Sequence, residues 1–71
     1  MIQVLEIVRD RAHEETYHMA LVNPDMISHV VVERNMQDRT RISMDNGESV
    51  HSKATILEIS ELIEEHYRRR V

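Results

Sequence analysis

An Asn-Gly turn in the second half of the chain constrains its fold more than any other feature. Residues 39–44 alternate polar and apolar side chains up to that turn, which predicts a strand with one buried face. A two-residue loop would place Val50 on the solvent face. A three-residue loop with Gly47 in the left-handed conformation places Val50 opposite Ile42, on the buried face. The sequence therefore predicts a hairpin with a three-residue loop and makes Gly47 a structural residue.

The segment after this hairpin has the sequence signals of an amphipathic helix. Thr55 and Glu58 have the spacing of a capping box, in which two side chains satisfy exposed backbone groups at the start of a helix. Apolar side chains then share one face at Ile59, Leu62, Ile63 and Tyr67. Acidic residues precede a terminal arginine triplet, an order that suits the helix dipole. The sequence therefore predicts a C-terminal helix packed across a sheet.

Further strands are predicted before the hairpin. Apolar, β-branched or alternating runs occupy residues 1–9, 16–22 and 26–34. Pro24 lies between the second and third runs, where a residue without a backbone donor favours a turn, and residues 35–38 are predicted to form another turn. We expect a single domain, residues 1–71, of the α+β class: a small antiparallel β-meander of four or five strands with one C-terminal α-helix packed on it.

The size and composition of the chain limit its core. It has 71 residues, five methionines, two tyrosines as its only large aromatic rings, and no cysteine. A core of this size supplies about 3 to 5 kcal/mol, and pairing with a second copy is the simplest further source of stability, so we expect a homodimer. No run approaches the roughly 20 apolar residues of a membrane span, and none resembles a signal peptide. We therefore expect a cytoplasmic protein without membrane insertion.

The predicted sheet leaves apolar side chains that one helix does not cover. Either Val22 or the pair Val30 and Val32 is expected on the face opposite the helix. This uncovered face predicts binding of a second copy or of another protein. The arginine end of the helix, Arg68, Arg69 and Arg70, is a second candidate for partner contact.

Strand arginines suggest nucleic-acid binding as an alternative. Arg39 and Arg41 project from one strand face, with Arg34 across the predicted turn, and such a row could contact RNA. The net charge of −4 argues against this function, as does the lack of aromatic residues beside the arginines. The competing interpretation is a solvated face whose arginines pair with Glu33 or Glu48.

The sequence contains no complete catalytic or metal-binding motif. The two histidines of residues 13–18 are five positions apart, whereas a zinc metalloprotease helix needs a spacing of four. A zinc site built from His13, His18 and a more distant histidine is the less favoured interpretation. One glycine cannot build a phosphate-binding loop, and no nucleophile is paired with a base. We expect neither enzymatic activity nor a cofactor.

The order of turn motifs resembles the small FlbD/SwrD family, which is associated with bacterial flagella and swarming motility. The motifs are Val22-Asn23-Pro24-Asp25-Met26-Ile27, the hairpin sequence of residues 40–48, and an acidic helix ending at His66-Tyr67-Arg68-Arg69-Arg70. The resemblance covers about residues 20–71. The opening segment departs from the family, because the connection at residues 10–15 contains no glycine. The resemblance implies a non-enzymatic accessory protein that acts through protein contacts and has no catalytic residue.

Two further interpretations stay open. Arg41-Ile42, followed by Ser49-Val50-His51 before a helix, is similar to CsrA-type translational regulators, which are dimers that bind messenger RNA. The acidic helix would also suit a phage-type inhibitor that mimics nucleic acid. The favoured prediction remains a small interaction or regulatory protein, either dimeric or bound to a protein partner.

Overall fold

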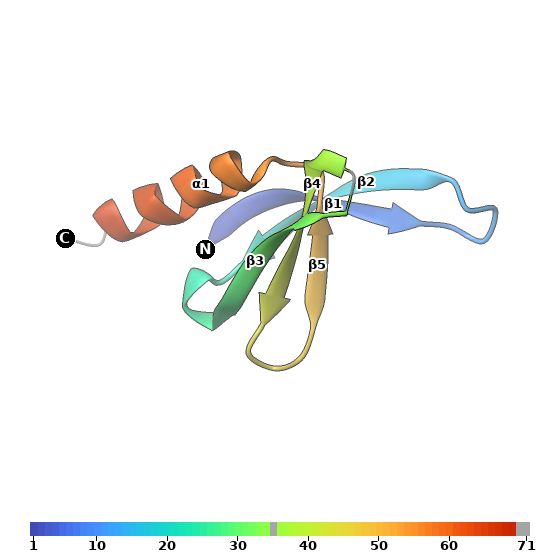
Figure 1. The fold of residues 1–71 in the computed structure, drawn as a ribbon. Coiled ribbons are helices and arrows are strands. Elements are labelled where there is room, and N and C mark those ends of the chain that lie inside the picture. The colour runs from blue at the N-terminus through green and yellow to red at the C-terminus, as the bar shows by residue number, and fades with distance from the viewer. Residues whose placement is uncertain (35, 70–71) are drawn as a thin grey trace.

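The computed structural model describes residues 1–34 and 36–69, with the backbone alone at positions 36 and 37. In this part of the chain, five strands form one antiparallel sheet and one helix lies across it (Figure 1). The elements are β1 (Ile2–Arg9), β2 (Glu15–Val22), the 3-10 turn η1 (Pro24–Met26), β3 (Ile27–Glu33), β4 (Met36–Met44), β5 (Ser49–Ser52) and α1 (Ile56–Arg68). The predicted α+β class, with a C-terminal helix packed on an antiparallel sheet, is confirmed.

The sheet joins a hairpin to a three-stranded meander. Its strand order is β2-β1-β5-β4-β3, so the first and last strands of the chain lie side by side. β1 and β2 pair along all eight residues of each strand, whereas β1 and β5 are in register at Glu6 and Ser52 alone. The far end of the β1–β2 hairpin therefore projects beyond the rest of the molecule (Figure 1).

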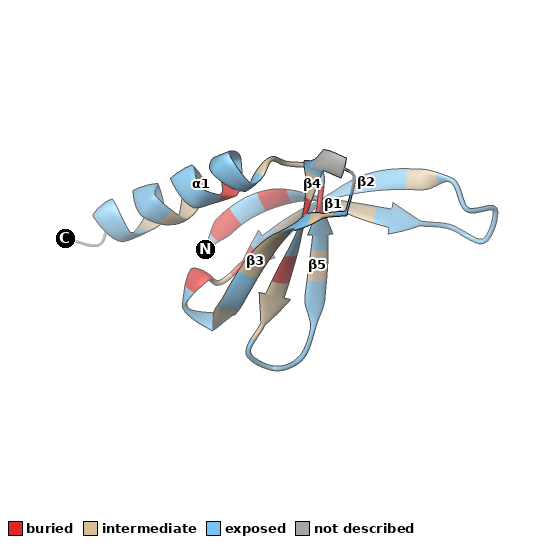
Figure 2. Cartoon of the chain, viewed as in Figure 1, coloured by how far each residue is buried: buried red, intermediate tan, exposed pale blue. Residues whose placement is uncertain are grey.

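The hydrophobic core lies between α1 and one face of the sheet. Its buried members are Ile2, Val4, Val22, Ile42 and Ile59. Figure 2 shows buried residues where α1 crosses the sheet and mostly exposed residues along the projecting hairpin. The alternation predicted for residues 39–44 is confirmed, because Thr40 and Ile42 are fully buried and Arg41 is exposed. No helix in the described residues has the length and apolar character needed to span a membrane.

The prediction that Val22 or the pair Val30 and Val32 would lie opposite the helix is wrong. Val22 is part of the buried core. Val30 pairs with Ile42 and Val32 pairs with Thr40, and directly opposed residues point to the same face of a sheet. Since Ile42 and Thr40 are buried beneath the helix, both valines face the helix side. Apolar side chains occur on both faces of β2, so its sequence pattern could not identify which face the helix covers.

The loop between β4 and β5 has the predicted conformation. The Gly47 N–H donates to the Met44 carbonyl at 3.0 Å, and the Met44 N–H donates to the Glu48 carbonyl at 2.8 Å. Gly47 has a φ of 89°, in the left-handed region. Val50 lies opposite Ile42, as the three-residue loop requires.

The loop between β1 and β2 repeats this conformation without a glycine. The His13 N–H donates to the Asp10 carbonyl at 3.1 Å, and the Asp10 N–H donates to the Glu14 carbonyl at 3.0 Å. His13 occupies the position equivalent to Gly47 and has a φ of 62°. Asp10 Oδ1 also accepts the N–H groups of Ala12 at 2.9 Å and Glu14 at 3.0 Å. These side-chain hydrogen bonds stabilise a turn in which a histidine adopts the left-handed conformation.

Substitutions in the two loops are expected to change the free energy of unfolding in opposite directions. Gly47→Ala is expected to lower the free energy of unfolding by about 1 kcal/mol, because alanine resists positive φ. An added Cβ would meet no atom within 4 Å, so backbone strain is the sole cost. His13→Gly is expected to raise the free energy of unfolding by about 0.5 to 1 kcal/mol. Urea unfolding of both variants tests the pair, and a stabilised Gly47→Ala protein would contradict the loop assignment.

The boundaries of η1 and α1 follow the predicted signals. Pro24 is buried in η1, and Asn23 Oδ1 accepts the Asp25 N–H at 3.0 Å. Thr55 Oγ1 accepts the Glu58 N–H at 3.1 Å, which confirms Thr55 as the N-cap of α1. The predicted turn at residues 35–38 is partly wrong, because β4 already begins at Met36; Asn35 lies outside the described residues.

A candidate interaction surface on the open face

The face of the sheet opposite α1, called the open face below, has no helix on it in the described structure. Four exposed apolar side chains of β1 and β2 gather there and are called the open-face patch: Leu5, Tyr17, Met19 and Leu21. Met19 is 65% exposed and Leu21 is 64% exposed. Both residues lie on β2, which forms one edge of the sheet.

The pairing of β2 with β1 explains why these side chains are exposed. Ala20 lies opposite Val4, and Val22 lies opposite Ile2, so the small and β-branched residues of β2 are directed to the helix side. Because successive side chains of a strand point to opposite faces, Met19 and its alternate neighbours take the open face. One helix cannot cover both faces, and the patch is the set it leaves.

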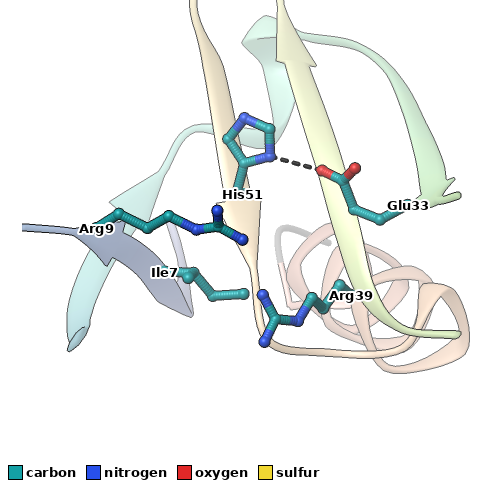
Figure 3. A pocket seen from close by; sticks show the side chains of 5 residues that line it. All are labelled: Ile7, Arg9, Glu33, Arg39 and His51. Carbon is teal, nitrogen blue, oxygen red and sulfur yellow. Dashed lines mark hydrogen bonds and ion pairs between the residues drawn. The ribbon is translucent and has the colours of Figure 1, made fainter. Parts of the chain in front are cut away.

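A hollow of about 380 Å³ lies on the open face beyond the patch. Five side chains from four strands line it: Ile7, Arg9, Glu33, Arg39 and His51. Figure 3 shows the guanidinium groups of Arg9 and Arg39 directed toward the side chain of Ile7 from opposite sides. The hollow therefore joins one apolar side chain to several polar groups.

A bidentate ion pair fastens the projecting hairpin to β4. Arg39 Nη2 donates to Glu15 Oε2 at 2.6 Å, and Nη1 donates to Oε1. Arg9 and the Tyr17 hydroxyl also donate to this carboxylate, at 3.5 and 3.3 Å. The Arg39 and Glu15 side chains are 19% and 22% exposed, so water screens their attraction only in part. The hydrogen bonds and charge of Arg39 lower the pKa of Glu15 from 4.5 to about 2, against an opposing effect of burial.

The lowered pKa of Glu15 predicts an acid-dependent loss of stability. A carboxyl group with a folded-state pKa below its unfolded value stabilises the folded protein above the unfolded pKa. That contribution is lost as the pH falls from about 4.5 to about 2. We expect wild type to exceed Glu15→Gln in free energy of unfolding at pH 6, and this difference to shrink toward pH 2. Urea unfolding across this range measures the difference.

Glu64→Gln is the matched control, because Glu64 pairs with Arg68 at 3.3 Å on the exposed side of α1. An exposed pair of this kind contributes little to stability. The free energy of unfolding of wild type and of the control variant should therefore fall in the same way between pH 6 and pH 2. If the free energy of unfolding of Glu15→Gln falls with pH in the same way as that of wild type, the structural role of the Glu15–Arg39 pair is contradicted.

His51 and Glu33 form a second polar contact in the hollow. His51 Nδ1 donates to Glu33 Oε1 at 2.6 Å (Figure 3). An ionised carboxylate accepts and cannot donate, so this contact places a proton on Nδ1. A histidine held in this way can act as a base, but the described lining of the hollow includes no Ser, Thr, Cys or Lys side chain for it to activate.

The described histidines and carboxylates form no metal centre. No group of three or more His, Cys, Asp or Glu side chains in this part of the chain is placed to hold a metal ion. His13 lies in the β1–β2 loop, while His18 lies within β2 and contacts Thr16 Oγ1 at 3.2 Å. The structure therefore does not bring these two histidines into a common ligand set.

The predicted arginine row is only partly available for binding. Arg41 is exposed on the open face, opposite His51, and Arg34 is exposed after β3. Arg39 is engaged by Glu15, so its guanidinium is not presented to solvent in the way the prediction requires. The three arginines therefore do not form one row of unpaired cations.

The arginines at the end of α1 pair with acidic residues of the same helix. Arg68 Nη2 donates to Glu64 at 3.3 Å, and Arg69 Nη2 donates to Glu65 at 2.7 Å. Both pairs have i to i+4 spacing, and they place opposite charges along one side of the last helical turns. Arg70 lies outside the described residues.

Val30 borders a groove on the helix side of the sheet. The groove has a volume of about 570 Å³ and is lined by Val30, Ile56, Ile59, Ser60, Ile63 and Glu64. Val32 is exposed near the end of β3. The two predicted partner-binding valines thus lie on the opposite side of the sheet from the open-face patch.

The sequence interpretation missed the open-face patch. Its signal was present in residues 16–22, where both alternating sets are apolar. With one helix in the chain, one of those sets has to stay uncovered by it. The sequence pattern does not determine which set stays uncovered, because that depends on how β1 pairs with both β2 and β5.

Comparisons of the chain with protein-family models, with curated proteins and with solved structures gave no match. The resemblance to the FlbD/SwrD family therefore stays a prediction from the turn motifs.

Proposed function

We propose that this protein is a small non-enzymatic interaction module with an accessory or regulatory role, and that its open face binds a protein partner. The observation that carries the proposal is the open-face patch, where Met19 and Leu21 are about two-thirds exposed beside Leu5 and Tyr17. Exposed apolar side chains that lie together, with polar groups around them, mark interaction sites on soluble proteins. The hollow and its ion pairs form such a polar border.

The charges around the patch indicate the chemistry of the partner. Lys53 Nζ lies 4.5 Å from the centroid of the Tyr17 ring, and Arg9 and Arg41 are exposed on the same face. These cations stand out in a chain with a net charge of −4. A surface with an apolar centre and carboxylates at its rim would complement them. We therefore infer an acidic-rimmed protein partner whose association weakens as the salt concentration rises.

RNA binding is less well supported. A phosphate contact by Arg39 would have to replace its two hydrogen bonds with Glu15. Tyr17, the aromatic residue of the patch, already packs against Lys53. An accessory role through protein contacts is also what the FlbD/SwrD resemblance implies. These observations favour a protein partner over nucleic acid.

Affinity capture from a nuclease-treated lysate of the expressing cells tests the proposal. Leu21→Glu is expected to lower partner recovery at least tenfold, because it places a charge in the centre of the interface. Leu57→Glu is the matched control: Leu57 is 65% exposed and lies on α1, on the other side of the sheet. The control should recover the partner as well as wild type does.

Three results would overturn the proposal. Equal recovery by Leu21→Glu and wild type would show that the open face is not the binding surface. Loss of recovery with Val32→Glu alone would move the site to the helix side of the sheet, near the groove bordered by Val30. Recovery that disappears with nuclease treatment would favour the RNA-binding alternative. Circular dichroism of each variant establishes that the fold is retained.

A further inference from the structure

We propose that the outer edge of β2 pairs antiparallel with β2 of a second copy, with Met19 opposite Met19 across a two-fold axis. The inference rests on the proposed function and deepens it, because this pairing would join the open-face patches of two copies into one surface. Three observations carry it: the direction of the backbone hydrogen bonds, the character of the edge, and the symmetry of its side chains.

The backbone groups of Met19 are directed to the outer edge of the sheet. The Leu5 carbonyl accepts the Lys53 N–H at 2.9 Å, so Leu5 forms its ladder hydrogen bonds on the β5 side. Met19 lies opposite Leu5, and in an antiparallel pair such residues direct their N–H and C=O groups away from each other. Tyr17 and Leu21, two positions away on either side, direct their backbone N–H and C=O groups to the outer edge as well. No described strand pairs with this edge of β2.

The edge formed by β2 lacks the features that usually prevent strand pairing. β2 contains no lysine or proline, its one charged residue is Glu15 at its first position, and its pairing with β1 has no register shift. The opposite edge, β3, is irregular: its register shifts between Ile27 and His29 and again between Val32 and Glu33. Long, regular and uncharged edges favour pairing with another strand, whereas bulges oppose it. β2 is therefore the edge suited to a second chain.

The side chains of β2 are symmetric about Met19. With Met19 opposite its own copy, Tyr17 lies opposite Leu21, and all of these side chains lie on the open face. A shift of the register by two residues would place Glu15 opposite Leu21, and an apolar contact would be lost. This self-complementarity identifies a second copy of the chain as the occupant, since a two-fold interface uses the same patch on both partners.

A single cysteine tests the register directly, because the chain has no cysteine of its own. Two Met19→Cys residues opposite each other would have Cα atoms about 5.5 Å apart, within the range of a disulfide. Two Leu21→Cys residues would be separated by about four positions along the strand, roughly 13 Å. Under mild oxidation we expect rapid disulfide formation by Met19→Cys and little by Leu21→Cys alone. A mixture of Tyr17→Cys and Leu21→Cys proteins should form the mixed disulfide.

Controls separate specific pairing from random collision. Leu57→Cys is equally exposed but lies on α1, so it should cross-link at least tenfold more slowly than Met19→Cys. Sedimentation velocity of the unmodified protein should give a mass near twice 8.4 kDa, and Leu21→Lys should give a monomer with an unchanged circular dichroism spectrum. Equal cross-linking rates at positions 19 and 57, or a monomer at millimolar concentration, would overturn the pairing.

The two proposals fail in different ways. A monomeric purified protein whose partner capture still depends on Leu21 would overturn self-pairing and leave the partner-binding proposal in place. A dimer that cross-links at Met19 but captures no other protein in a Leu21-dependent way would support self-pairing and overturn the acidic-rimmed partner.

Discussion

Ile59→Ala is expected to leave the protein largely unfolded at 25 °C. Ile59 is 1% exposed and is the buried residue of α1 within the described helix, where it belongs to the same core cluster as Ile2, Val4 and Ile42. Truncating a buried isoleucine to alanine removes about 2 to 5 kcal/mol. A domain of this size has about 3 to 5 kcal/mol of stability in total, so the loss is comparable to the whole. Urea titration followed by circular dichroism at 222 nm measures it.

Leu57→Ala is the control for this prediction. Leu57 is two positions earlier on α1 and well exposed, so its truncation should change the free energy of unfolding by less than about 0.5 kcal/mol. An Ile59→Ala protein that unfolds cooperatively within 1 kcal/mol of wild type would show that α1 does not depend on this contact.

Thr40→Val is expected to stabilise the protein by about 1 to 2 kcal/mol. Thr40 and Ser52 lie opposite each other on β4 and β5, and both residues are fully buried. Neither hydroxyl oxygen has a hydrogen-bond partner among the described residues. A buried polar group without a partner retains the cost of its desolvation, and valine has nearly the same shape without the hydroxyl. Adding Ser52→Ala should raise the free energy of unfolding further.

Thr16→Val provides the comparison at an exposed threonine. Thr16 Oγ1 donates to the Val8 carbonyl at 3.1 Å, so its hydroxyl already has a partner. This variant should show no gain in the free energy of unfolding measured by urea titration. A destabilised Thr40→Val protein would mean that the buried hydroxyl makes a favourable contact that valine cannot replace.

Local signals predicted much of the fold. The register that places Val50 opposite Ile42 followed from one glycine and the need to bury one strand face. The start of α1 followed from Thr55, whose side chain accepts the Glu58 N–H as a capping residue does. These features depend on residues close together in the sequence, so the sequence alone was enough to locate them.

The candidate site could not be located in the same way, because it depends on pairing between distant strands. β1 lies between β2 and β5, and this arrangement selects which face of β2 the helix covers. It also brings Arg39 to Glu15, a contact 24 positions apart that no local pattern indicates. The left-handed conformation of His13 was missed because histidine is not the residue expected there; the signal was Asp10, whose side chain accepts two loop N–H groups.

The most direct test of the binding surface is a backbone amide NMR spectrum of the labelled protein, recorded with and without its captured partner. We expect the largest changes at Leu5, Met19 and Leu21, on the open face, with little change at Ile56 and Ile63 in the groove on the helix side. Changes confined to the two isoleucines, with the β2 signals unmoved, would contradict the proposal that the open face binds the partner.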